Sequence, residues 1–228
     1  MEVKGLNVAF REDRVIRDLN FNLKEKENLV IVGPNGAGKS VLLRALLNTV
    51  PHKGDVIWRK GIKIGYVPQR FLPDRDLPLS VEEFFDFKKL SIDKVHQALC
   101  SVGLHGPSIL KKKIGVISSG QLQRIMIAWV MIDDPDVLLF DEPTAGIDIE
   151  GEETVYNLLA KLEKEKDLTM ILITHDLNVV YKFADSVLCL NKKLVCYGTP
   201  QEALNPESLN ELYGGDVKVY KHAHKHGN

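Results

Sequence analysis

No apolar run in this 228-residue sequence is long enough to cross a bilayer. The longest uninterrupted run, Ile125 to Ile132, is bounded on both sides by charged residues and is far shorter than the roughly 18 residues that a membrane span needs. The N-terminus also lacks the order of basic, apolar and small residues that marks a secretory signal. We therefore predict a cytoplasmic chain that reaches a membrane only through a partner.

The sequence also has few cysteines and almost no net charge. The three cysteines, Cys100, Cys189 and Cys196, form neither an even framework nor a C-x-x-C pair, so we expect reduced thiols in the core. The net charge of −1 provides no global positive field for nucleic acid. With 44% hydrophobic and 27% charged residues, the composition predicts one well-cored domain over residues 1–228.

Segments typical of strands and of helices alternate along the chain. Two alternating stretches between Glu2 and Asn22 predict an antiparallel hairpin. Three continuous apolar runs, at residues 29–32, 137–140 and 170–174, are typical of strands buried on both faces, and helical patterns separate them. The sequence therefore predicts an α/β fold with a parallel, two-sided sheet.

A helical insertion is expected between about residues 70 and 135. Ser80 and Glu83 have the spacing of a capping box, which predicts a helix start. Near the end of the insertion, apolar residues at i, i+3, i+4 and i+7 predict an amphipathic helix that begins just after Ser118 to Gln121. These apolar residues are Ile125, Ala128, Trp129 and Ile132.

The segment Gly33 to Ser40, GPNGAGKS, matches the pattern G-x-x-x-x-G-K-[ST] between a predicted strand and a predicted helix. Backbone N–H groups of such a loop converge on phosphate oxygens. Lys39 would reach the β and γ phosphates, and Ser40 would hold Mg²⁺. A glycine-rich turn that matched by chance would not need this strand, loop and helix context. We predict nucleotide contacts from Gly33, Pro34, Asn35, Gly36, Ala37, Gly38, Lys39, Ser40 and Val41.

Two carboxylates follow the apolar run at residues 137–140. Asp141 would lie at the carboxyl end of a sheet strand and face Mg²⁺ through water. Glu142 would orient or deprotonate the attacking water, as a general base. An Asp-Glu pair after a strand is by itself more typical of a solvated turn, and the phosphate loop about a hundred residues earlier favours the catalytic interpretation.

The order of these motifs resembles that of the ABC-transporter ATPases over nearly the whole chain. The motifs are the phosphate loop, Gln69, Ser118 to Gln121, Asp141 to Glu142, Asp148 and His175. The resemblance implies a P-loop NTPase core with a parallel sheet, an N-terminal antiparallel β subdomain and an inserted helical subdomain. It also implies ATP and Mg²⁺ as cofactors.

The resemblance assigns roles to four further residues. Phe10 is expected to stack on adenine, with Val15 nearby. Gln69 is expected to touch Mg²⁺ and to report to a membrane subunit, and His175 is expected to contact the γ-phosphate as a switch. An aromatic residue on a strand, a glutamine after proline and a histidine at a strand end are by themselves typical of ordinary core or surface positions.

The segment Ser118 to Gln121 is similar to the family's LSGGQ signature, which meets the γ-phosphate bound by the opposite subunit. Ser119 replaces a glycine and adds a Cβ where backbone approaches the phosphate. The residues that match the signature are Ser118, Gly120 and Gln121. A signature that acts in trans implies a head-to-tail homodimer, with Asp148 at the junction of the two sites.

Two longer stretches resemble the ATPases of zinc and manganese importers, and zinc is favoured. They are residues 64–69 running into 76–81, and residues 187–191 running into 196–200. The resemblance implies integral membrane permease subunits, an external solute-binding protein and a location on the inner face of the membrane. A predicted flexible tail, residues 215–228, carries His222, His224 and His226, which would bind transition metals weakly or have no role.

Three alternatives remain open at this stage. The chain could serve an importer of an iron chelate or another small solute. It could be a soluble ABC-type ATPase that acts on DNA or ribosomes, although such proteins usually have a coiled coil or two cassettes in one chain. A binding module without hydrolysis is disfavoured by Lys39, Asp141, Glu142 and His175.

Overall fold

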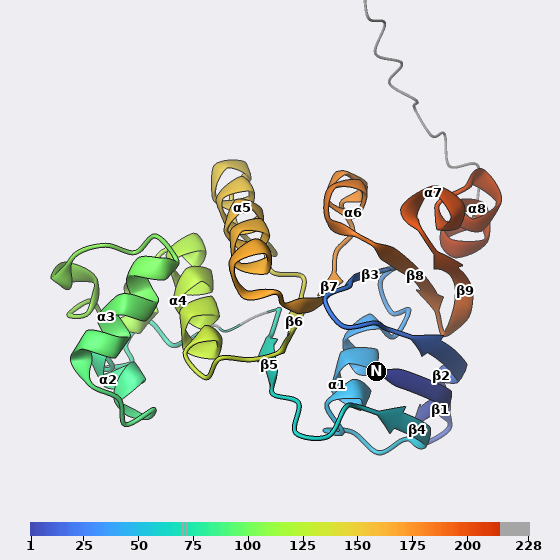
Figure 1. Ribbon diagram of the computed structural model, residues 1–228, viewed down its shortest axis with the longest axis horizontal. Coiled ribbons are helices and arrows are strands. Elements are labelled where there is room, and N and C mark those ends of the chain that lie inside the picture. The colour runs from blue at the N-terminus through green and yellow to red at the C-terminus, as the bar shows by residue number, and fades with distance from the viewer. Residues whose placement is uncertain (70, 72, 215–228) are drawn as a thin grey trace, which may run out of the picture.

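The computed structural model describes residues 1–69, 71 and 73–214, which form two sheets surrounded by helices (Figure 1). The larger sheet has the strand order β5-β6-β7-β3-β8-β9 and is parallel except for β9, which runs antiparallel to β8. Its strands are β3 (Asn28–Val32), β5 (Ile64–Val67), β6 (Val137–Asp141), β7 (Thr169–Ile173), β8 (Ser186–Asn191) and β9 (Lys193–Gly198). The predicted α/β fold with a parallel sheet is confirmed.

A second, antiparallel sheet has the strand order β2-β1-β4. Its strands are β1 (Glu2–Phe10), β2 (Asp13–Asn22) and β4 (Lys53–Ile57). The hairpin predicted between Glu2 and Asn22 is therefore confirmed, and β4 joins it from beyond helix α1 (Lys39–Leu46). This sheet and α1 pack together on one face of the parallel sheet (Figure 1).

The central strands are apolar throughout because both of their faces are covered. In β3, Leu29 and Ile31 point into a core shared with the antiparallel sheet, whereas Val30 and Val32 point into the opposite core. This alternation follows from the two-residue period of a strand. Every residue of β3, β6 and β7 is buried, as expected for a sheet with cover on both sides.

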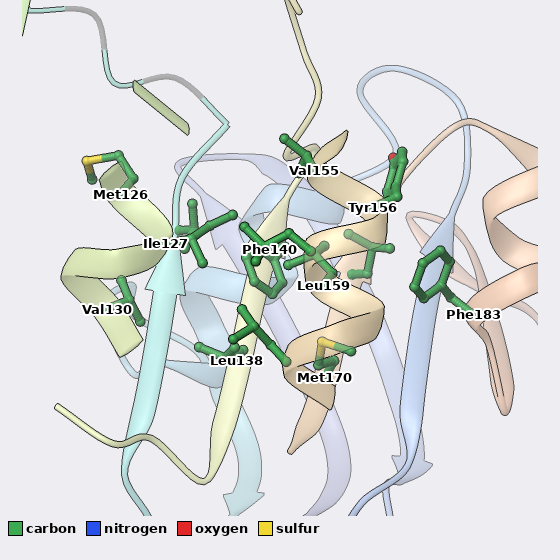
Figure 2. Close-up of a cluster of buried hydrophobic side chains, with 14 of the residues drawn as sticks. Met126, Ile127, Val130, Leu138, Phe140, Val155, Tyr156, Leu159, Met170 and Phe183 are labelled. Atoms are coloured by element: carbon green, nitrogen blue, oxygen red, sulfur yellow. The ribbon is translucent and has the colours of Figure 1, made fainter. Parts of the chain in front are cut away.

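Helices α5 (Ile149–Lys166) and α6 (Leu177–Phe183) cover the second face. Figure 2 shows Leu138 and Phe140 of β6 directed toward Val155 and Leu159 of α5. Two short helices, α7 (Pro200–Ala203) and α8 (Pro206–Tyr213), lie beside β8 and β9 at one end of the molecule (Figure 1). No helix among the described residues is both long enough and apolar enough to cross a membrane.

Between β5 and β6 the described chain is helical. The elements are α2 (Val81–Asp86), α3 (Ile92–Ser101), the 3-10 turns η1 (Pro107–Ile109) and η2 (Ile114–Val116), and α4 (Ser119–Met131). They form a group at the end of the parallel sheet opposite α7 and α8 (Figure 1). The predicted capping box is confirmed, because Glu83 N donates to Ser80 Oγ at 3.2 Å and Ser80 N donates to Glu83 Oε2 at 2.7 Å.

The prediction of three reduced cysteines is wrong for two of them. Cys189 and Cys196 form a disulfide, and their Cα atoms lie 4.8 Å apart. The two residues are direct partners in the β8–β9 ladder, so the antiparallel return of β9 places their side chains together. A separation of seven residues carries no such information without the register. Cys100 is free, and the histidine tail lies outside the described residues.

Candidate nucleotide-binding site

The loop from β3 to α1 forms one wall of an open cavity of about 360 Å³. Gly38 caps the helix with a φ of 100°, and a Cβ at that position would lie 3.1 Å from the Val15 side chain and carbonyl oxygen. Glycine is therefore required here by both conformation and space. The cavity is lined by Val15, Asn35, Gly36, Ala37, Gly38, Lys39, Ser40, Val41, Gln69 and Glu142.

Lys39 is the buried cation of this cavity. Its Nζ atom donates to the carbonyl oxygens of Gly33 at 2.9 Å and Pro34 at 3.1 Å, and it lies 3.9 Å from Glu142 Oε1. Burial lowers the pKa of Lys39, while the charges of Glu142 and Asp141 act in the opposite direction. The loop thus fixes a positive group beside the backbone amides of a helix start, which is an arrangement suited to phosphate.

Asp141, the last residue of β6, lies beside the first turn of α1. Ser40 Oγ donates to Asp141 Oδ1 at 3.0 Å, and the hydroxyl of Tyr66 on β5 donates to Oδ2 at 3.5 Å. Burial raises the pKa of Asp141, and the Ser40 hydrogen bond opposes this effect. Sequence reasoning missed Tyr66. Its only signal was its position on a strand next to the one that carries Asp141.

Glu142 is placed by an uncommon backbone conformation. Its φ is 47°, in the left-handed region, and its N–H donates to the Ile173 carbonyl at the end of β7. A residue with a side chain in this region usually costs about 1 to 3 kcal/mol, and such conformations occur preferentially at functional sites. The carboxylate accepts a hydrogen bond from Gln69 Nε2 at 2.5 Å and faces the cavity next to Lys39.

A second open cavity, also of about 360 Å³, lies at the N-terminus of α4. Ser118 caps this helix, and its Oγ accepts from Gln121 N at 3.4 Å. Asp148 lines the same cavity and caps α5, where it accepts from Gly151 N at 2.9 Å. The predicted signature segment and Asp148 therefore share one cavity, and that cavity shares no lining residue with the one around the phosphate loop.

Comparison with known proteins establishes the family of this chain. The family model described as ABC transporter matches residues 16–145. The chain belongs to this family. It is 34% identical over 232 residues to the zinc import ATP-binding protein ZnuC of Pasteurella multocida, and the match covers 99% of this chain and 88% of that protein.

Two solved structures agree with this assignment. One is an ABC transporter assigned to the metal-chelate type in an inward-facing conformation, with a TM-score of 0.80, 27% identity and coverage of 92% of this chain and 87% of that one. The other is cbiO1 from Clostridium perfringens, part of the ABC transporter complex cbiONQ, with a TM-score of 0.72, 29% identity and 92% coverage of both chains. The chain is thus an ABC ATPase that binds and hydrolyses ATP.

Two residues with roles implied by the ABC resemblance stand apart from these contacts. Phe10, at the end of β1, is 44% exposed and does not line the cavity that Val15 lines. His175 is exposed beyond the end of β7 and makes no hydrogen bond or ion pair within the part of the chain that the structure describes. Stacking on adenine and contact with the γ-phosphate therefore stay predictions for these two residues.

Ser119, the departure from the ABC signature, lies in the first turn of α4 and lines the cavity that contains Asp148. In the head-to-tail dimer that the signature implies, we expect Ser119→Gly to retain ATP hydrolysis and to tighten the ATP-bound pair, because removing the Cβ would let backbone approach phosphate more closely. The substitution should cost α4 at most about 1 kcal/mol. Sedimentation with and without ATP measures the effect. A marked loss of activity would show that the Ser119 hydroxyl makes a required contact.

Proposed function

We propose that this ABC ATPase supplies energy to an importer of a divalent metal ion, with zinc favoured over manganese. The observation that carries the proposal is the similarity to ZnuC over 99% of the chain, combined with an intact set of phosphate-loop and carboxylate contacts. An importer of an iron chelate or another small solute is the second candidate. The structural match to a metal-chelate type transporter favours it at the level of the fold.

The proposal includes Mg²⁺ bound with ATP at the phosphate loop. Mg²⁺ prefers hard oxygen ligands. Ser40 and Gln69 line the phosphate-loop cavity and offer a hydroxyl and an amide oxygen, and the Asp141 carboxylate lies next to this cavity in contact with Ser40. The contact between Ser40 and Asp141 already holds two of these groups together, so the residues fit the ion. When bound, Mg²⁺ would neutralise charge on the β and γ phosphates.

The chain's own residues then account for hydrolysis. Lys39 binds phosphate oxygens, and Asp141 and Ser40 are the groups that would hold the metal. Glu142 orients the attacking water and takes its proton, a role that typically contributes about 10² to 10⁴ in rate. The role is supported by its contacts with Gln69 and Lys39 and by its position at the wall of the phosphate-loop cavity. His175 contacts the γ-phosphate in this proposal.

The active unit in this proposal is a homodimer. Each chain has a phosphate-loop cavity and a signature cavity that share no lining residue. In this proposal one nucleotide lies between the phosphate loop of one chain and the signature of the other. Head-to-tail pairing places Ser118, Ser119, Gly120 and Gln121 over the partner's γ-phosphate. ATP then stabilises the closed dimer and hydrolysis releases it.

The motion of this dimer would be passed to an integral membrane permease that receives its solute from an external binding protein. The helical segment between β5 and β6 presents Phe87, which is 73% exposed, and Val116, which is 64% exposed. Such side chains are accessible to a partner protein. In this proposal the ATPase lies on the cytoplasmic face of the membrane and is bound through this segment.

The metal assignment is tested by uptake. In the organism that encodes this chain, replacing it with the Glu142→Gln variant should reduce energy-dependent uptake of radioactive zinc to background, because dimer closure without hydrolysis cannot complete the cycle. Uptake of manganese and of ferric chelates is measured in the same cells. If zinc uptake stays normal and the uptake of manganese or of a ferric chelate is lost, the lost solute and not zinc is the substrate of the importer.

A further inference from the structure

A buried series of hydroxyl groups links the segments that follow β6 and β7. Thr144 Oγ1 lies 3.3 Å from the hydroxyl oxygen of Tyr156 on α5, and that oxygen lies 3.3 Å from Thr174 Oγ1. All three residues are at most 9% exposed. Two further contacts end the series, from Thr144 Oγ1 to Glu152 Oε1 at 2.7 Å and from Asp176 N to Thr174 Oγ1 at 3.1 Å.

The number of protons fixes the direction of donation along this series. The Glu152 carboxylate can only accept, so Thr144 must spend its single proton on it. Thr144 must then accept from Tyr156, and Tyr156 must accept from Thr174. Thr174 in turn accepts from the backbone N–H of Asp176. The hydroxyls thus form one polarised chain in which each bond strengthens the next.

Tyr156 is the central member and stays a donor. Burial raises the pKa of Tyr156, so its hydroxyl keeps its proton at neutral pH. Its ring packs in the core beside Phe183, with ring centroids 5.8 Å apart (Figure 2). The ring therefore packs in the core, and the hydroxyl bonds to the two threonines.

The two segments that this chain joins carry groups used in the proposed mechanism. Thr144 lies two residues after Glu142, and its carbonyl accepts from Ile147 N next to Asp148. Thr174 immediately precedes His175. The backbone bond from Glu142 N to Ile173 O at 3.1 Å ties the same segments at their strand ends. The Tyr156 hydroxyl adds a second tie, on the side of α5.

We propose that Tyr156 is a positioning residue for ATP hydrolysis, because its hydroxyl holds the segment of Glu142 and Asp148 in register with the segment of His175. The inference rests on the roles proposed for Glu142 and His175. Tyr156 touches neither nucleotide nor metal, since it lies in the core behind the site and lines neither cavity. Its loss should therefore affect the catalytic step rather than the binding of ATP.

Tyr156→Phe tests this assignment, because it removes the hydroxyl and retains the ring. We expect kcat to fall about tenfold, the size of effect that misplacing groups by fractions of an ångström produces, with KM for ATP changed by less than about twofold. Binding of a fluorescent ATP analogue, measured without turnover, should be unchanged. Thr174→Val cuts the same chain at the next link and also removes the acceptor of Asp176 N, so it should lower kcat at least as far, also if Tyr156→Phe folds poorly.

Phe183→Leu is the matched packing control, because it disturbs the ring contact and leaves every hydroxyl in place. It should lower the melting temperature and leave kcat unchanged. The double variant Tyr156→Phe with Thr174→Val should lose no more than Thr174→Val alone, as expected for coupled residues. An unchanged kcat in Tyr156→Phe, an equal loss in Phe183→Leu, or additive losses would overturn the inference. Absence of hydrolysis by the unaltered protein would instead contradict the proposed function.

Discussion

Glu142→Gln is expected to abolish steady-state ATP hydrolysis while ATP-dependent dimerisation is preserved. The amide keeps the size of the carboxylate but cannot take a proton from water, so kcat should fall by about 10² to 10⁴. Lys39 and Ser40 remain available to bind the nucleotide, because their bonds to Gly33 and Asp141 do not involve Glu142. Loss of the negative charge beside Lys39 also reduces repulsion of the γ-phosphate. The variant should therefore accumulate as a closed dimer with ATP trapped between the chains.

Two measurements separate these effects. Phosphate release gives turnover, and sedimentation velocity with ATP and Mg²⁺ gives the fraction of dimer. Glu153→Gln is the matched control, because the same substitution is then made at an exposed residue of α5 that lines neither cavity. Normal phosphate release by Glu142→Gln would remove the role given to Glu142. Loss of the ATP-dependent dimer would show that its carboxylate contributes to closure instead.

The location of the phosphate-loop site followed from the sequence because parallel strands end at one edge. The apolar runs in β3 and β6 predicted two parallel strands, and the polar residues directly after or at their ends had to meet there. The structure brings Ser40 and Asp141 into contact, and Lys39 donates to the carbonyl of Gly33, which directly follows β3. The length and continuous apolar character of these runs sufficed to predict this edge of the sheet, because strands buried on both faces are apolar throughout.

Contacts that depend on strand register or on packing between elements could not be predicted. The cross-strand pair Cys189 and Cys196 requires the exact return of β9, and sequence spacing alone made these residues appear as free thiols. Tyr66 and Tyr156 were equally hidden, because an aromatic residue on a strand or helix is ordinarily read as core. In each case the hydroxyl finds a partner on another element, which only the packed structure reveals.

Lys39→Ala is expected to remove most of the affinity for ATP. In the structure the ammonium is held over the loop by the carbonyls of Gly33 and Pro34, so it is already placed for phosphate and loses little entropy on binding. A hydrogen bond to a charged group contributes about 1.5 to 3 kcal/mol, which corresponds to a loss of roughly 10- to 150-fold. The fold should survive, because alanine relieves the cost of burying an ammonium.

Titration with a fluorescent ATP analogue measures this loss, and the melting temperature without nucleotide checks the fold. Lys60→Ala provides the control, because it deletes an exposed lysine that lies outside the phosphate-loop cavity. At one ATP concentration, added ATP should raise the melting temperature of Lys39→Ala much less than that of the unaltered protein and of Lys60→Ala, because stabilisation by a ligand depends on its concentration relative to Kd. Equal stabilisation of all three proteins would place the nucleotide away from this loop and would remove the basis for the roles of Ser40, Asp141 and Glu142 as well.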